Sequence, residues 1–219
     1  MYTPHPSDIL TQAYTRTPYQ GADPEDSRVL FLGTDANFDW GIEGSPIFGQ
    51  VLNYLENGPR FWRRSGVHHP FLLPGYTGDG KPYHTAFATM GLGSEHADDI
   101  SFLELLNVPT SKDPSSSAKP RLEADDLNPN HLDFLERVIR GGRSKLVFLP
   151  NDVALLMHKS ARFSWLPRIA EPYSDSMELW TNIDGTLVLK SFHFSYRWNP
   201  KKKQRQLQEM KRLISETLV

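Results

Sequence analysis

The sequence predicts an α/β protein, a three-layer α/β/α sandwich with a central four-stranded, mainly parallel sheet. Four short apolar runs alternate along the chain with segments whose apolar residues recur at helical spacing, a pattern typical of parallel α/β folds. The runs are apolar at almost every position, as expected of strands that are buried on both faces. The chain has 219 residues, which is enough for one continuous core.

Residues 1–27 are polar and contain several prolines, so we expect an irregular N-terminal arm. The remainder, residues 28–219, is expected to form a single domain. Its first strand covers residues 28–33 (R-V-L-F-L-G). A helix follows over residues 45–57, where a serine and a proline precede apolar residues at helical spacing.

The middle of the chain contains two further strands. Residues 66–82 are rich in glycine, proline and histidine, which predicts a loop, and a short helix is expected at 83–91. The second strand covers residues 99–106 (D-I-S-F-L-E-L-L). An amphipathic helix at 129–140, closed by two glycines, then leads to the third strand at 145–150 (K-L-V-F-L-P).

The last part of the chain completes the predicted sheet. A helix is expected at 152–159, the fourth strand at 185–192 (G-T-L-V-L-K-S-F), and the final helix at 200–217. In open parallel sheets, ligands bind beyond the carboxyl ends of the strands. The loops expected to carry function are therefore residues 33–44, 104–110 and 193–199.

The composition excludes several kinds of chemistry. The chain contains no cysteine, which excludes disulfides, cysteine-ligated zinc, iron–sulfur clusters and thiol nucleophiles. No window approaches the roughly 18 apolar residues of a membrane span, and the first residues lack the pattern of a secretion signal. We therefore expect a cytoplasmic protein, without a membrane partner, that acts as a monomer.

Five segments in order carry a resemblance to a known family. L-G-T-D-A-N-F resembles a glycine-glutamine-aspartate-proline-tyrosine motif, with Asp35 at its aspartate and alanine in place of the proline. Phe48 follows at the family's spacing, and R-F-W at 60–62, L-E-L-L-N-V-P-T at 103–110 and H-F-S at 193–195 complete the set. Together they resemble the uracil-DNA glycosylase superfamily, nearest its mismatch-specific branch.

The resemblance implies that Asp35 orients or activates a water molecule and that His193 stabilises the departing base. Cleavage of an N-glycosidic bond passes through an oxocarbenium-like sugar, which needs a water on one face and negative charge nearby. The base departs with negative charge, so a neutral imidazole that donates a hydrogen bond stabilises it. Asn37 is the second choice for the residue that positions the water.

A base inside a duplex must be flipped out before it can react, and the resemblance implies that Phe48 stacks on the flipped base. Glu104, or alternatively Asn107, is implied to read the edge of the base. An ionised carboxylate accepts hydrogen bonds without donating them, so Glu104 favours an amino-bearing edge such as that of cytosine. Asn37 replaces the tyrosine by which strict uracil enzymes exclude 5-substituted bases, so such bases are expected to be admitted.

DNA, single- or double-stranded, is the expected partner. The formal net charge of -2 argues against a protein that coats nucleic acid nonspecifically, but cations gather in the stretch R-W-N-P-K-K-K-Q-R and beyond it. The serine of the last motif is expected to contact a phosphate, and the side chains after it to enter the vacated base stack. The residues implied to contact DNA are Ser195, Tyr196, Arg197, Trp198, Lys201 and Lys202, followed by Lys203 and Arg205.

Three of the candidate site residues also have a purely structural explanation, whereas Glu104 does not, because a buried carboxylate is costly unless it is paired. Asp35 follows a strand and a glycine, where an aspartate commonly caps a turn. His193 is equally compatible with a hydrogen-bonded histidine at a strand end. Phe48 lies at helical spacing with Val51 and Leu55, which is typical of a core residue.

The histidines do not predict a metal site. His68 and His69, with His84 or His96, lack a spacing such as H-E-x-x-H. We therefore expect neither a metal nor another cofactor.

The sequence thus predicts a monofunctional DNA glycosylase that hydrolyses the N-glycosidic bond of a flipped-out uracil-like or modified base, with 5-substituted cytosine as one candidate. Repair of DNA and defence against phage DNA with modified bases are both compatible purposes. Two alternatives stay open: a non-catalytic module that binds altered DNA, and a hydrolase of small nucleosides.

Overall fold

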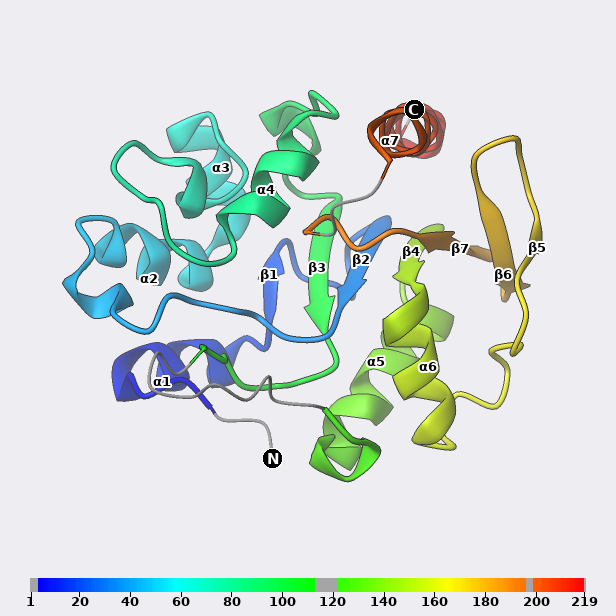
Figure 1. The fold of residues 1–219 in the computed structure, drawn as a ribbon, viewed down its shortest axis with the longest axis horizontal. Coiled ribbons are helices and arrows are strands. Elements are labelled where there is room, and N and C mark those ends of the chain that lie inside the picture. The colour runs from blue at the N-terminus through cyan, green and yellow to red at the C-terminus, as the bar shows by residue number, and fades with distance from the viewer. Residues whose placement is uncertain (1–3, 113–121, 196–198, 219) are drawn as a thin grey trace.

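The computed structural model describes residues 4–112, 122–195 and 199–218. Within these residues the chain forms one seven-stranded sheet in the order β1-β3-β2-β4-β7-β6-β5 (Figure 1). The four central strands, β3, β2, β4 and β7, run parallel, whereas β1, β6 and β5 pair antiparallel at the two edges. The strands are β1 (Tyr19–Gly21), β2 (Val29–Gly33), β3 (Ile100–Glu104), β4 (Leu146–Pro150), β5 (Glu171–Pro172), β6 (Glu178–Ile183) and β7 (Thr186–Ser191).

The expected number of four strands is wrong, although all four predicted strands are present and parallel. β2, β3 and β4 are buried at every position, which explains their continuous apolar runs. The strands that the sequence missed lie at the edges of the sheet. β1 has three residues, β5 has two exposed ones, and β6 alternates between exposed and less exposed positions.

Helices cover both faces of the sheet. Successive residues of a strand point to opposite sides, so strands that are apolar at every position have two faces to bury. Phe31 of β2 packs with residues of α4 and α7, whereas its neighbour Leu30 packs with residues of α5 and α6. Figure 1 shows these two pairs of helices on opposite sides of the sheet. The α-helices are α1 (Asp8–Arg16), α2 (Phe48–Glu56), α3 (Gly58–Ser65), α4 (Lys81–Ala88), α5 (Pro129–Gly141), α6 (Asn151–Lys159) and α7 (Pro200–Leu218). Short 3-10 helices are η1 (Ile42–Gly44), η2 (Pro70–Leu72), η3 (Ser94–His96) and η4 (Ala124–Asp126).

The N-terminal segment differs from the irregular arm expected for residues 1–27. It contains the helix α1, which the Ser7 hydroxyl caps by accepting a hydrogen bond from the backbone N–H of Leu10 (3.1 Å). Leu10 and Tyr14 are fully buried with residues of α2 and α3. We call this group the third apolar cluster, since one apolar cluster lies on each face of the sheet. The strand β1 then joins the sheet beside β3. This segment is therefore part of the packed structure.

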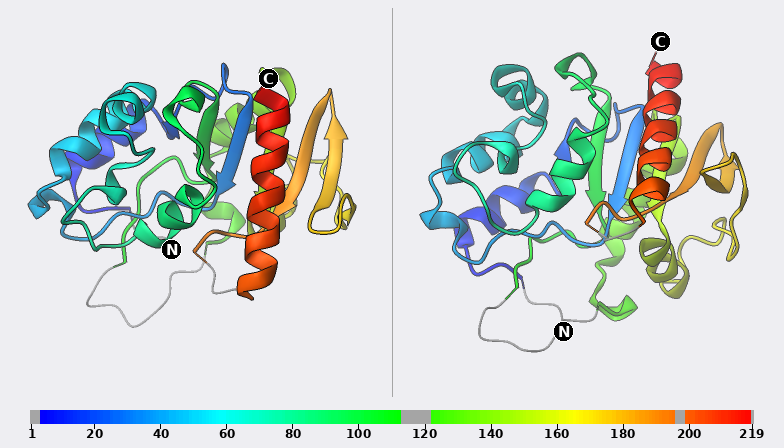
Figure 2. Two further views of the ribbon diagram at one scale, coloured as in Figure 1. Left: turned by 90° about the horizontal axis from the view of Figure 1, so that it is seen from above. Right: turned by 45° about the horizontal axis from the view of Figure 1, so that its top comes forward.

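The carboxyl ends of the parallel strands lie at one edge of the sheet, where α7 also begins (Figure 2). The loops after β2, β3 and β7 start there, as the sequence predicts for functional loops. Among the described residues, none of the helices combines the length and apolar character needed to cross a membrane.

Candidate active site

A cavity of about 350 Å³ lies where three of these loops meet α4. Its lining includes Asp35 and Asn37 from the loop after β2, Glu104 from the end of β3, and His193 and Ser195 from the loop after β7. The structure therefore brings together the predicted acid, imidazole, amide and edge-reading carboxyl, which are far apart in the sequence. The size is at the lower end of the range typical of small-molecule sites.

Asp35 is held by the loop that follows β3. The hydroxyl of Thr110 donates a hydrogen bond to Oδ2 of Asp35. Thr110 is fixed in turn, because its N–H donates to the carbonyl of Ala36 (2.9 Å) and its carbonyl accepts from the N–H of Phe38 (2.9 Å). The Asp35 carboxylate is therefore oriented at the cavity by a side chain of a neighbouring loop.

The imidazole of His193 is oriented by its own loop. The backbone N–H of Ser195 donates to Nδ1 of His193 (3.3 Å), so the neutral ring carries its proton on Nε2. Burial lowers the pKa of His193 and Lys203 lowers it further, while Asp152 and Asp35 act in the opposite direction. The ring of Tyr83 packs against it, with 5.4 Å between ring centroids. His193 is thus a neutral hydrogen-bond donor.

Glu104 owes its position to a missing side chain. It pairs with Gly33 in the parallel ladder, and a Cβ on Gly33 would lie 2.1 Å from Oε2 of Glu104. Gly33, the last residue of β2, therefore leaves the space that the carboxyl group occupies. Within the described residues, Oε2 is buried and has no hydrogen-bond partner. Burial raises the pKa of Glu104 well above its ordinary value of 4.5, and the nearby Asp35 raises it further.

A protonated Glu104 changes the expectation about the base. The preference for an amino-bearing edge holds for an ionised carboxylate, which only accepts hydrogen bonds. A neutral carboxyl group donates one hydrogen bond and also accepts, so it matches a carbonyl edge as well as an amino edge. The charge of Glu104 therefore does not select cytosine over uracil.

Asn37 provides a second polar atom for a ligand. Its backbone forms a parallel bridge with Thr110, and its side chain lines the cavity. In the described part of the chain, Oδ1 of Asn37 is buried without a hydrogen-bond partner. A donor on a bound base, or a water molecule, would satisfy it.

Two predicted base-binding residues do not line the cavity. Phe48 is the first residue of α2, and its ring packs at the side of the third apolar cluster. Asn107 lies in the turn after β3, outside the cavity wall. The aromatic rings that do line the cavity are those of Phe38, Phe71, Tyr83 and Phe102.

Several lining residues were missed by the sequence prediction. Gln20 comes from β1, which the sequence assigned to an irregular arm, so no signal pointed to it. Tyr83 and His84 lie in α4, and His84 was weighed only as a metal ligand. Phe38 was visible, since it ends the motif L-G-T-D-A-N-F.

The buried histidines form a hydrogen-bonded cluster beside the cavity. Nε2 of His68 and Nδ1 of His84 are 3.1 Å apart, and the ring of His69 stacks on that of His84 with centroids 3.5 Å apart. Burial is the main cause that lowers the pKa of all three, in His68 to about 3. Among the residues that the structure describes, no group of three or more potential metal ligands is arranged to hold an ion.

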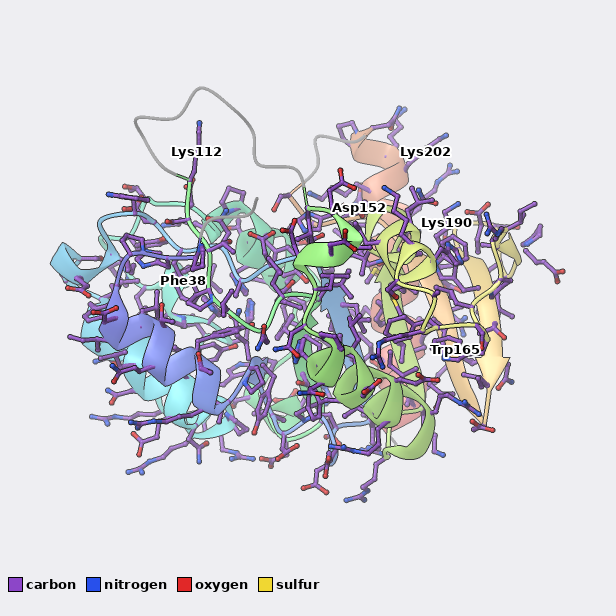
Figure 3. The ribbon with its side chains drawn as sticks, turned by 90° about the horizontal axis from the view of Figure 1, so that it is seen from below. Phe38, Lys112, Asp152, Trp165, Lys190 and Lys202 are labelled. Carbon is purple, nitrogen blue, oxygen red and sulfur yellow. The ribbon has the colours of Figure 1, made fainter. Side chains whose placement is uncertain are left out.

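The residues predicted to contact DNA are placed differently relative to the cavity, as far as the structure describes them. Ser195 lines it, and Lys112 does so from the opposite loop. Lys202 lines a neighbouring cavity of about 620 Å³ that shares His193. Figure 3 shows Lys112, Asp152 and Lys202 along one edge of the molecule. Lys201 is exposed at the start of α7, and Tyr196, Arg197 and Trp198 lie outside the described residues.

No protein-family model matches the chain, and no curated protein matches it.

Proposed function

We propose that the chain is a monofunctional DNA glycosylase of the uracil-DNA glycosylase type that removes a flipped-out, uracil-like or modified base. The observation that supports this most is the meeting of Asp35 and His193 at one cavity, because they come from loops far apart in the sequence. A carboxylate and a neutral imidazole donor are the two groups that hydrolysis of an N-glycosidic bond requires.

The reaction assigns a role to each group. The Asp35 carboxylate, oriented by Thr110, holds a water against the sugar carbon and stabilises the positive charge that develops on the ring. The Nε2–H of His193 donates to the base as the bond breaks and negative charge accumulates on the leaving group. Glu104 and Asn37 bind the polar edge of the base.

The mainly parallel sheet with helices on both faces is compatible with this proposal. Ser195 lines the cavity, Lys202 lines the neighbouring cavity that shares His193, and Lys201 and Lys202 are exposed at the start of α7. The exposed lysines supply the salt-dependent attraction for phosphates that such binding needs. The protein acts on DNA as a monomer in this proposal.

The test is single-turnover release of free base from duplexes that carry uracil, hypoxanthine, 5-hydroxymethylcytosine or its glucosylated form. We expect release from at least one duplex, a loss of about 10²- to 10⁴-fold in Asp35→Ala, and a loss of about 10²- to 10³-fold in His193→Ala. Asp39→Ala is the matched control, since Asp39 lies further along the same loop and does not line the cavity. It should keep the full rate.

Two other outcomes would favour the alternatives. Tight binding of one modified duplex without release of base would favour a binding module. Turnover of free nucleosides, with no affinity for DNA that falls as salt is added, would favour a nucleoside hydrolase.

A further inference from the structure

Gln20, Phe102 and His84 form what we call the inner wall of the cavity. Gln20 of β1 pairs with Phe102 of β3 in the sheet, and the rings of Phe102 and His84 lie 5.9 Å apart. Phe102 precedes Glu104 by two residues, so both side chains point to the same face of the strand, with Phe102 deeper below its carboxyl end. Gln20 and His84 are each only 6% exposed.

The side-chain amide of Gln20 has a defined orientation. The backbone N–H of Phe71 donates to Nδ1 of His69 (3.2 Å), so the neutral ring carries its proton on Nε2. That Nε2–H donates to Oε1 of Gln20 (2.8 Å). The oxygen of the amide is therefore turned toward His69, and the opposite end is an NH₂ group with two donors. Tyr14 lies beside this amide, but its hydroxyl has no hydrogen-bond partner among the described residues. The NH₂ group of an amide that lines the cavity is a donor that a ligand can use.

The inner wall carries no charge. Burial lowers the pKa of His84, as does the neighbouring His68, so the imidazole is neutral, and Gln20 and Phe102 do not ionise. A charged substituent placed there would lose its hydration without gaining a counter-ion. An uncharged oxygen acceptor would instead be matched by the N–H of Gln20.

We propose that Gln20, oriented by His69, is a specificity-determining residue that donates a hydrogen bond to an uncharged acceptor on a substituent of the bound base. This inference rests on the proposed function. In the proposed reaction the scissile bond lies between Asp35 and His193, and the edge of the base lies at Glu104. Because Phe102 lies below Glu104 on the same face of β3, a substituent beside that edge is directed to the inner wall. His69 is a positioning residue, because it acts only through the amide of Gln20.

The test measures binding of free bases and needs neither DNA nor cleavage. 5-Formyluracil and thymine are the probes, because they are similar in size and differ in the presence of an oxygen acceptor on C5. We expect the wild-type protein to bind 5-formyluracil about three- to tenfold more tightly than thymine, the range of one neutral hydrogen bond. Gln20→Met, which keeps the length of the side chain and removes its donors, should abolish this preference and leave the affinity for thymine nearly unchanged.

A measurement on the wild-type protein covers the case in which the variant does not fold. The side-chain NH₂ resonances of Gln20 should shift when 5-formyluracil is added and should stay in place with thymine. Equal affinity for both bases, no binding of either, or unchanged Gln20 resonances with 5-formyluracil would overturn the inference. Failure of the proposed function would be seen separately, as the absence of base release from every duplex.

Discussion

At the scale of single residues, Gly33 and Glu104 illustrate how a missing side chain determines a site. The carboxyl group of Glu104 occupies the space where any other residue at position 33 would place its Cβ. It is buried, and Oε2 has no partner among the described residues. Such a group is costly to the folded state unless it is protonated or bound to a ligand. The cavity therefore contains a group whose hydrogen bonds a ligand would complete.

Replacing this carboxyl group should stabilise the protein at neutral pH. Because the folded-state pKa of Glu104 is raised, the folded protein holds a proton that the unfolded chain releases above about pH 4.5. Stability is therefore lost as pH rises above that value. Glu104→Gln has no such loss, so in urea unfolding its free energy of unfolding should exceed that of the wild type near pH 7.5, and the difference should shrink toward pH 4.5.

Glu56→Gln is the control for this prediction. Glu56 is exposed at the end of α2, and its substitution should change stability by less than about 0.5 kcal/mol. A Glu104→Gln protein whose advantage grows toward acid would show that the carboxyl group is ionised when the protein is folded.

The three buried histidines predict the opposite dependence on pH. Their pKa values are lowered in the folded protein, in His68 to about 3, so the unfolded chain binds more protons below about pH 6.5. The free energy of unfolding should fall as pH falls through this window, by at most about 1.4 kcal/mol per pH unit for each histidine. Urea unfolding between about pH 7.5 and about pH 5.5 measures this slope.

The variant His68→Phe should make that slope shallower by about one proton. Above about pH 7 the histidines are neutral in both states, so their contribution to the slope should vanish. A slope that is unchanged in the variant would mean that His68 is not responsible for any of it.

At the scale of elements, prediction from sequence succeeded where burial is uniform and failed at the edges of the sheet. β2, β3 and β4 are buried at every position, and their apolar runs have no other explanation. β1 has only three residues, and its place in the sheet depends on pairing with β3, a long-range contact that no local pattern records. The helices α5, α6 and α7 end within about two residues of their predicted bounds, because the helical periodicity of their apolar residues marks them locally.

The prediction of the site followed the same rule. Asp35, Asn37 and His193 follow predicted strands, Glu104 lies near the end of one, and all four line the cavity. Gln20 was missed because its strand was missed. Phe48 was placed by its spacing in the sequence, but the chain enters α2 at this residue and the helix directs the ring to another cluster. Spacing along the chain does not specify the direction of a side chain.

The contact between α3 and β1 offers a test of how closely the edge strand is packed. A Cβ on Gly58, the first residue of α3, would lie 2.4 Å from the backbone oxygen of Gly21 in β1. The atoms nearest to this Cβ are all backbone atoms of Gly21, which cannot turn away as a side chain can. Gly58→Ala must therefore separate α3 from β1, and we expect a loss of about 1–3 kcal/mol in the free energy of unfolding. Urea unfolding measures it.

Gly49→Ala is the matched control. Gly49 lies in α2 with nothing within 4 Å of a Cβ, so alanine there should be neutral or should stabilise by up to about 1 kcal/mol. Equal stabilities of the two variants would contradict the close packing of β1.

At the scale of the whole molecule, Arg28, the residue before β2, connects the sheet to the last helix, α7. Its guanidinium donates to the carboxylate of Asp99 (2.9 Å) and to the backbone carbonyls of Thr217 (3.1 Å) and Leu218 (2.9 Å). The latter two belong to the C-terminal end of α7, where a positive charge is favourable. A single side chain thus connects the entry to β2, the start of β3 and the end of the described chain.

We expect Arg28→Met to lower the free energy of unfolding by about 1–3 kcal/mol, because hydrogen bonds from a charged group are lost at a partly buried position. Chemical unfolding of the purified protein measures this. Arg143→Met is the control, since Arg143 is 71% exposed and 3.9 Å from its partner Asp26, and such pairs contribute little. An equal effect of both substitutions would show that Arg28 has no special role.

The first and last residues that line the cavity are Gln20 and Ser195, so its lining comes from both the N-terminal and the C-terminal parts of the chain. A ligand bound there would contact both β1 and the segment that follows β7, and it would therefore stabilise the two together. Amide hydrogens of β1 and of the segment after β7 should then slow their exchange with solvent together.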